Sequence, residues 1–157
     1  MNLKYIRAKK DDADLVIKIY NAAFYDDYIK YGKCPAYGRT RASMESSIEE
    51  IPKHIIYDDD NPIGALSVAD RGNGEYYLGC LCVLPEFQGK GIGTQAFRFI
   101  LEFYSDWNKL TLVTPADKEE NIAFYTKKCG FKIDRTEMDG DLKIVHFLLE
   151  REDTVKG

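Results

Sequence analysis

One stretch of the sequence limits the fold more than any other: an apolar strand that runs into a glycine-rich turn. Residues 76–84 carry no charged side chain and are apolar at both odd and even positions. This pattern is typical of a strand inside a sheet that is covered on both faces. The sequence then reads Pro85-Glu86-Phe87-Gln88-Gly89-Lys90-Gly91-Ile92-Gly93-Thr94. An amphipathic helix is predicted to follow as far as Asp106.

Apolar periodicity and turn signals predict the remaining elements. Their order is strand, two helices, three strands, helix, strand, helix and two strands, which indicates an α+β or mixed α/β fold. Asp11 or Asp12 is expected to cap the first helix, residues 25–40 are expected to be irregular, and Asp117 with Glu120 has capping-box spacing before a helix that ends at Gly130. Further elements are expected near residues 3–8, 41–51, 54–58, 63–70, 110–113, 131–137 and 142–149.

Length and composition predict one soluble domain over residues 1–157. The chain is 45% apolar and 31% charged, with a net charge of −4, as in ordinary globular proteins. The acidic balance argues against nucleic acid as a partner. The charged N-terminus lacks the apolar core of a signal peptide, and no apolar run reaches the roughly 20 residues of a membrane helix. A cytoplasmic protein without a membrane partner is therefore predicted.

The four cysteines do not form the pattern of a disulfide framework or a metal site. Cys80 and Cys82 lie two residues apart and would point the same way on a strand. A zinc site would need ligands from elsewhere, and His54 and His146 are remote in the sequence. Buried thiols are therefore favoured over ligands, and no metal is expected.

The glycine-rich turn has the properties of an anion site. Gly89, Gly91 and Gly93 let a ligand approach the backbone, and the first helical turn offers unpaired N–H groups with the positive end of the helix dipole behind them. The sequence lacks G-x-x-x-x-G-K-[ST], and its glycine spacing and position differ from the dinucleotide fingerprint. The alternative is a tight strand-to-helix corner that needs glycine for clearance.

Two blocks resemble the GCN5-related N-acetyltransferases (GNAT). Gln88-x-x-Gly91-x-Gly93, after Val83-Leu84-Pro85-Glu86-Phe87, is similar to the acetyl-CoA-binding motif of that family. Asn121-Ile122-Ala123-Phe124-Tyr125, followed by Gly130-Phe131, resembles its later helix block. The blocks are correctly ordered and span residues 76–131. The resemblance implies a central mixed, mostly antiparallel twisted sheet with helices on both faces, and acetyl-CoA as co-substrate.

The resemblance also implies roles for individual residues. The strand at Leu81, Cys82 and Val83 would pair with the pantetheine arm, and the amide of Val83 or Cys82 would face the thioester oxygen. Asn121 would hydrogen-bond the arm, and Tyr125 would protonate the departing sulfur. A core aromatic is the alternative for Tyr125. The pyrophosphate would lie on the backbone amides of Gln88, Gly89, Lys90, Gly91, Ile92, Gly93 and Thr94.

The base that removes the proton from the amine is not fixed by the motifs. In several family members a glutamate serves, but its position falls on Tyr77 in this chain. Glu75 lies two residues earlier, on the same face of the strand, and is a candidate base acting through water. A solvated charge beside a turn is the alternative. His146 is another candidate, since histidine changes its protonation near neutral pH.

The acceptor is expected near the exit of the first helix and the final hairpin. Tyr25, Asp26, Tyr28 and Tyr31 would suit a small cationic amine through aromatic contact and charge pairing. A surface loop whose tyrosines cover the sheet edge is an equal alternative, and nearby basic residues would suit an acidic acceptor.

The predicted function is acetyl transfer from acetyl-CoA to a primary amine of a small molecule or peptide. The amine would attack directly, through a tetrahedral intermediate that N–H donors stabilise. One alternative is transfer of a longer acyl group. Another is a non-catalytic acyl-CoA sensor or partner-binding module. The resemblance leaves a homodimer open.

Overall fold

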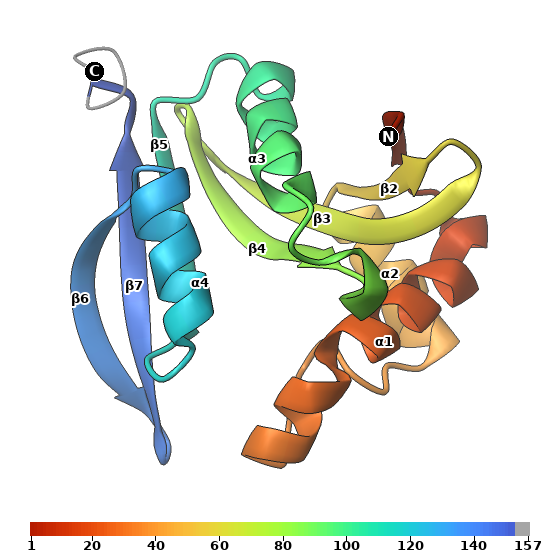
Figure 1. Cartoon of the computed structure of the whole chain (residues 1–157), viewed down its shortest axis with the longest axis horizontal. Coiled ribbons are helices and arrows are strands. Elements are labelled where there is room, and N and C mark those ends of the chain that lie inside the picture. Colours follow the sequence, from red (N-terminus) through yellow and green to blue (C-terminus); the bar gives the residue numbers. More distant parts are fainter. Residues whose placement is uncertain (153–157) are drawn as a thin grey trace. The chain divides into compact units, whose positions relative to one another are not determined.

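The computed structural model describes residues 1–152 and contains a seven-stranded mixed sheet with four α-helices (Figure 1). The strand order is β1-β2-β3-β4-β5-β7-β6. The β4–β5 pair is parallel, while β1–β2, β2–β3, β5–β7 and β6–β7 are antiparallel. The predicted fold class, a mixed and mostly antiparallel sheet, is therefore confirmed. The elements are β1 (Leu3–Arg7), α1 (Ala13–Tyr31), α2 (Arg41–Glu50), β2 (Lys53–Asp58), β3 (Asn61–Gly72), β4 (Glu75–Val83), α3 (Ile92–Phe103), β5 (Lys109–Pro115), α4 (Glu119–Ala123), β6 (Lys132–Asp139) and β7 (Leu142–Glu150).

The chain divides into two compact units. Unit 1 comprises Met1–Val68 and Cys80–Ala96, and unit 2 comprises Ala69–Gly79 with residue 97 onward. β3, β4 and α3 each contribute residues to both units. None of the helices in residues 1–152 combines the length and the apolar character that crossing a bilayer requires.

The core of unit 1 lies between α1, α2 and the strands β2 and β3. Val16 and Tyr20 of α1 and Met44 of α2 pack with Ile55 and Ala65 in one buried cluster. α2 begins as the sequence predicts: Thr40 is its N-cap, and the Thr40 side chain accepts a hydrogen bond from the backbone N–H of Ser43.

The prediction that residues 25–40 are irregular is wrong for the first part of that segment. α1 continues to Tyr31 and ends at Gly32, whose φ of 75° gives the left-handed conformation of a helix C-cap. The residues before Gly32 include neither glycine nor proline, so nothing in the local sequence stops the helix earlier.

The core of unit 2 is built on β5 and β7. Leu110 and Leu112 of β5 alternate with exposed or half-buried neighbours, and Phe147 and Leu149 of β7 are buried with them. This period-two burial covers one face of the two strands. The closing hairpin predicted around Asp139-Gly140 is present, with Asp139 opposite Leu142.

Two helix boundaries differ from the predictions. α3 ends at Phe103 rather than Asp106, and α4 begins at Glu119 with Lys118 as N-cap, two residues after the predicted start near Asp117. The capping box of Asp117 with Glu120 stays a prediction. After α4 the segment Phe124–Lys128 forms a π-helical turn. It is closed by a 3.2 Å hydrogen bond from the Cys129 N–H to the Phe124 carbonyl. Gly130 follows with a φ of 84°, as expected for the predicted stop.

His54 makes the stability of the fold sensitive to acid. Its side chain in β2 is 2% exposed, and burial, with a smaller contribution from Arg7, lowers its pKa to about 4. The pKa of a histidine in an unfolded chain is near 6.5. Between pH 6.5 and pH 4, His54 is therefore protonated in the unfolded chain and neutral in the folded chain. We expect the free energy of unfolding to fall by up to about 3 kcal/mol between pH 6.5 and pH 4. Urea denaturation at several pH values between 6.5 and 4 measures this change in the free energy of unfolding. A His54→Leu variant should lose this part of the pH dependence, and an equal slope in both proteins would contradict the assignment.

Candidate active site

The glycine-rich loop between β4 and α3 lies in unit 1. A short 3-10 turn covers Pro85–Phe87, and Gln88 is extended. Gly89 and Gly91 have φ values of 77° and 78°, in the left-handed region that side chains other than glycine rarely adopt. A Cβ atom added at either glycine would meet no heavy atom within 4 Å. The alternative of a tight corner that needs glycine for clearance is therefore wrong about clearance at these two positions. Glycine is required there by the left-handed backbone conformation.

The loop is held to the end of β4 and presents the start of α3. The Gln88 side-chain Nε2 donates to the carbonyl oxygen of Val83 at 3.0 Å. The Lys90 ammonium lies 5.6 Å from the centre of the Phe87 ring. The first helical hydrogen bond runs from the Gln95 N–H to the Gly91 carbonyl at 3.1 Å. The N–H groups that come before Gln95 therefore have no helical acceptor, which fits a bound anion.

The strand residues predicted to meet the cofactor arm lie at the end of β4, also in unit 1. Cys82 is buried in the core of that unit, with Cys80 packed against the same cluster. Leu81 and Val83 are half-buried and alternate with them. The two cysteines thus point the same way, as predicted.

Neither Cys80 nor Cys82 has a metal-binding environment. Among residues 1–152 there is no group of three or more potential metal-ligating side chains. Hydrogen bonds from Cys82 and Tyr20 to the Cys80 sulfur, with a smaller contribution from the Lys53 ammonium, lower the pKa of Cys80 against the effect of burial. In unit 2, burial raises the pKa of Cys129 to about 12. Cys129 is therefore protonated and a poor nucleophile at neutral pH.

In unit 2 the parallel pairing of β4 and β5 is short. It joins Glu75–Tyr77 to Lys109–Thr111, whereas the pairing of β5 with β7 continues to Pro115. Beyond Thr111, the described part of β5 has a strand partner on one side only.

Asn121 and Tyr125 lie on α4 and on the π-helical turn that follows it. Tyr125 is 8% exposed, and its ring packs against Phe124, Phe131 and Phe147 at centroid distances of 5.0, 5.7 and 5.9 Å. Asn121 is half-buried. π-helical turns are rare and occur frequently at functional sites. Neither propensity nor spacing in the sequence indicated this one.

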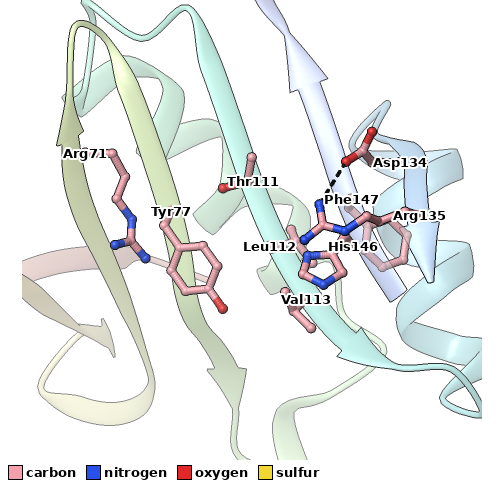
Figure 2. A pocket seen from close by; sticks show the side chains of 9 residues that line it. All are labelled: Arg71, Tyr77, Thr111, Leu112, Val113, Asp134, Arg135, His146 and Phe147. Atoms are coloured by element: carbon pink, nitrogen blue, oxygen red, sulfur yellow. Dashed lines mark hydrogen bonds and ion pairs between the residues drawn. The ribbon is translucent and has the colours of Figure 1, made fainter. Parts of the chain in front are cut away.

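Unit 2 also holds an open pocket of about 440 Å³ on its sheet (Figure 2). Tyr77, which occupies the position of the family glutamate, lines it. His146 of β7 lines it too, and the His146 Nε2 lies 2.6 Å from the Glu137 Oε1. The lining residues are Arg71, Tyr77, Thr111, Leu112, Val113, Asp134, Arg135, His146 and Phe147.

A register shift in β6 brings the polar side chains of this pocket together. Ile133 pairs with Phe147, but Arg135 rather than Asp134 pairs with the next residue, His146. The extra residue places Arg135 and Glu137 on the face of His146. Sequence reasoning identified His146 as a candidate but missed Arg135, because no residue pattern marks the shift.

Glu75 lies outside the group of residues that line the pocket. It is the first residue of β4, half-buried and opposite Lys109 in the register. Alternation places Glu75 on the same face as Tyr77. A role through water stays a prediction.

The predicted acceptor residues of α1 lie in unit 1. The rings of Tyr28 and Tyr37 stack at 4.4 Å with an angle of 14°, and Tyr25 lies 6.1 Å from Tyr37. Asp26 is exposed, and the Lys30 ammonium is 5.3 Å from the centre of the Tyr31 ring. The stacked pair holds the loop after α1 against the helix and leaves no room for a cation between its rings. Binding of a cationic acceptor there stays a prediction.

The sequence matches the acetyltransferase (GNAT) family over residues 16–131. The match covers more than half of the chain, which therefore belongs to this family. The uncharacterized protein YrkN of Bacillus subtilis (strain 168) is 36% identical over 80 residues, which are 51% of this chain and 43% of that protein. The chain thus spans less than half of the length of this curated relative.

Solved acetyltransferases share the fold. An acetyltransferase from Thermus thermophilus is similar with a TM-score of 0.76 and 16% identity, over 96% of this chain and 97% of that chain. The aminoglycoside acetyltransferase AAC(6')-Ib, in complex with paromomycin and acetyl-CoA, is similar with a TM-score of 0.76 and 17% identity, over 99% and 97% of the two chains. The family match confirms the predicted family, and these structures confirm the predicted fold.

Proposed function

We propose that this chain acts as a single GNAT domain that transfers an acetyl group from acetyl-CoA to a primary amine of a small molecule or peptide. The observation that carries the proposal is the loop before α3. Gly89 and Gly91 adopt left-handed backbone with open space where a Cβ would lie. The helix that follows offers N–H groups to an anion. The loop therefore fits the pyrophosphate of acetyl-CoA.

The family motif assigns roles in acetyl-CoA binding to single residues. Backbone amides of the segment 88–94 would hold the pyrophosphate, and the edge of β4 at Leu81, Cys82 and Val83 would pair with the pantetheine arm. The amide of Cys82 or Val83 would stabilise the oxyanion. Asn121 would hydrogen-bond the arm. These roles rest on the family motif.

The chemistry is direct attack of the amine on the thioester. The C–N bond forms, a tetrahedral intermediate collapses, the C–S bond breaks, and Tyr125 donates its phenolic proton to the departing sulfur. The Tyr125 ring is fixed by three neighbouring aromatic rings, which would hold the hydroxyl in one direction. The high pKa of Cys129 argues against a covalent intermediate on that residue.

His146 is the base that the geometry supports best. It lines the unit 2 pocket, and Glu137 lies at hydrogen-bond distance from its Nε2. A carboxylate partner orients an imidazole and stabilises its protonated form. Glu75, acting through water, remains the alternative base, and Glu75→Gln separates the two.

We expect the His146→Gln variant to lower kcat/KM by about 10²-fold near neutral pH. The wild-type rate should fall on acidification, because a protonated imidazole accepts no proton. The variant should lose this acidic limb. Initial rates of thiol release from pH 5.5 to 9 check this. An acidic limb that survives in His146→Gln and disappears in Glu75→Gln would assign the base to Glu75.

Calorimetric titration with acetyl-CoA, with CoA as the comparison, tests the proposed function first. Micromolar binding is expected, because the loop is preformed for the pyrophosphate that both ligands share. Thiol release is then measured with a panel of primary amines. Absence of binding would reduce the loop to a structural turn and overturn the proposal. Binding with no release for any amine would favour the non-catalytic sensor.

A further inference from the structure

Two arginines line the pocket of unit 2. Arg71 of β3 and Arg135 of β6 approach it from opposite sides, with Tyr77 and His146 between them (Figure 2). Both arginines are exposed. They come from strands far apart in the sequence and line the same pocket.

Two acidic side chains lie near this pocket, and neither of them pairs with Arg71. The Asp134 carboxylate lies 3.5 Å from the Arg135 Nη1. Both side chains are exposed, and an exposed ion pair of this kind adds little to the stability of the protein. Glu137 is engaged with His146. Among residues 1–152 no carboxylate pairs with Arg71, whose guanidinium carbon lies 5.0 Å from the centre of the Tyr77 ring.

An arginine held against an aromatic ring is prepared for an anionic ligand. A guanidinium that stacks on an aromatic ring keeps its N–H edge available for a ligand. That edge matches the two oxygens of a carboxylate or the oxygens of a phosphate. The aromatic and aliphatic lining, Tyr77, Phe147 and Val113, would contact the rest of a small ligand.

We propose that this pocket binds the acceptor through an anionic group, held by Arg71 and Arg135, so that the substrate is an amine that also carries a carboxylate or a phosphate. The inference rests on the proposed acetyl transfer and names its substrate class. A polycation would meet two like charges in this pocket, whereas an amino acid or an amino phosphate would place its anion between them. His146 lies in the same pocket, where it can reach the amine.

Matched pairs of ligands test the inference. Each standard amino acid is compared with its carboxamide, and phosphoethanolamine with ethanolamine, first by calorimetric binding and then by thiol release with acetyl-CoA. Spermidine serves as the cationic acceptor. We expect at least one anionic member to exceed its neutral partner by roughly 10-fold or more in affinity and in kcat/KM. If only the amino acids exceed their neutral partners, the pocket binds a carboxylate. If only phosphoethanolamine exceeds its neutral partner, the pocket binds a phosphate.

The arginine variants then assign the preference to this pocket. Arg71→Gln and Arg135→Gln should each weaken binding of the anionic ligand by roughly 10-fold, leaving the neutral partner unchanged. Arg98→Gln, at an exposed arginine of α3, should change neither. Unchanged preference in both pocket variants would overturn the inference.

The outcomes separate this inference from the proposed function. Acetylation of neutral amines or spermidine with no gain from an anionic group would overturn the pocket assignment and keep acetyl transfer. Anion-dependent binding that Arg71→Gln abolishes, without turnover of any amine, would keep the pocket and overturn acetyl transfer. Failure of every ligand both to bind and to react would overturn the pocket assignment.

Discussion

Replacing Tyr125 with phenylalanine is expected to lower kcat by about 10²- to 10⁴-fold, the usual contribution of a general acid. The affinity for acetyl-CoA should stay within about twofold, because the ring and its packing against Phe124, Phe131 and Phe147 are retained. Steady-state rates of thiol release and calorimetric titration measure the two quantities. A fall in kcat at constant affinity identifies a group that acts in the chemical step.

Tyr76→Phe is the matched control for this prediction. Tyr76 is also a buried tyrosine of unit 2, and its hydroxyl lies 2.5 Å from the Asp106 carboxylate. Loss of this bond should reduce the free energy of unfolding by about 1.5–3 kcal/mol and leave kcat unchanged. If Tyr125→Phe also leaves kcat unchanged, Tyr125 is a core aromatic, and another group protonates the departing sulfur.

Replacing Gly91 with glutamate is expected to weaken acetyl-CoA binding by roughly 100-fold or more, about 2.7 kcal/mol. The new side chain would project into the open space beside the loop, since a Cβ there meets no heavy atom within 4 Å. Its charge would repel the pyrophosphate and compete for the helical N–H groups. The φ of 78° adds backbone strain of about 1 kcal/mol. Calorimetric titration measures the affinity for acetyl-CoA. Thermal unfolding measures the loss of stability caused by the backbone strain.

Gly38→Glu controls for strain and charge. Gly38 has a φ of 74°, and a Cβ there also meets no heavy atom within 4 Å, but it lies in the loop after α1. The two variants should therefore lose similar stability, while only Gly91→Glu loses affinity. Equal affinities in the two variants would show that the glycine loop does not hold the cofactor.

Much of the fold could be predicted because its signals are local. Periodicity identified the strands near residues 3–8 and 54–58, and the left-handed requirement of Gly130 marked the end of the last helical segment. Boundaries were less predictable. The helix α1 continues through seven residues, Tyr25–Tyr31, that were predicted as irregular, because many polar and aromatic residues suit a helix as well as a loop.

The candidate site also has a part that local sequence signals predict and a part that they do not. The glycine loop, Asn121 and Tyr125 were identified because each belongs to a continuous motif. The pocket could not be identified, since Arg71, Tyr77, Arg135 and His146 come from four strands. Their association depends on the strand order and on a one-residue shift in β6. The sequence contains neither as a local pattern.

The sequence by itself determined the covered strand, the glycine turn and the helix after it, because chain direction, left-handed φ and apolar spacing are properties of neighbouring residues. Only the tertiary structure decided what surrounds each chemical group. The 2.6 Å contact of His146 with Glu137 and the place of Arg71 against Tyr77 depend on register and strand pairing. Packing also decided the pKa values: burial lowers that of His54 and raises that of Cys129. Desolvation depends on the groups that surround a residue in the folded protein, so the residue type alone does not determine it.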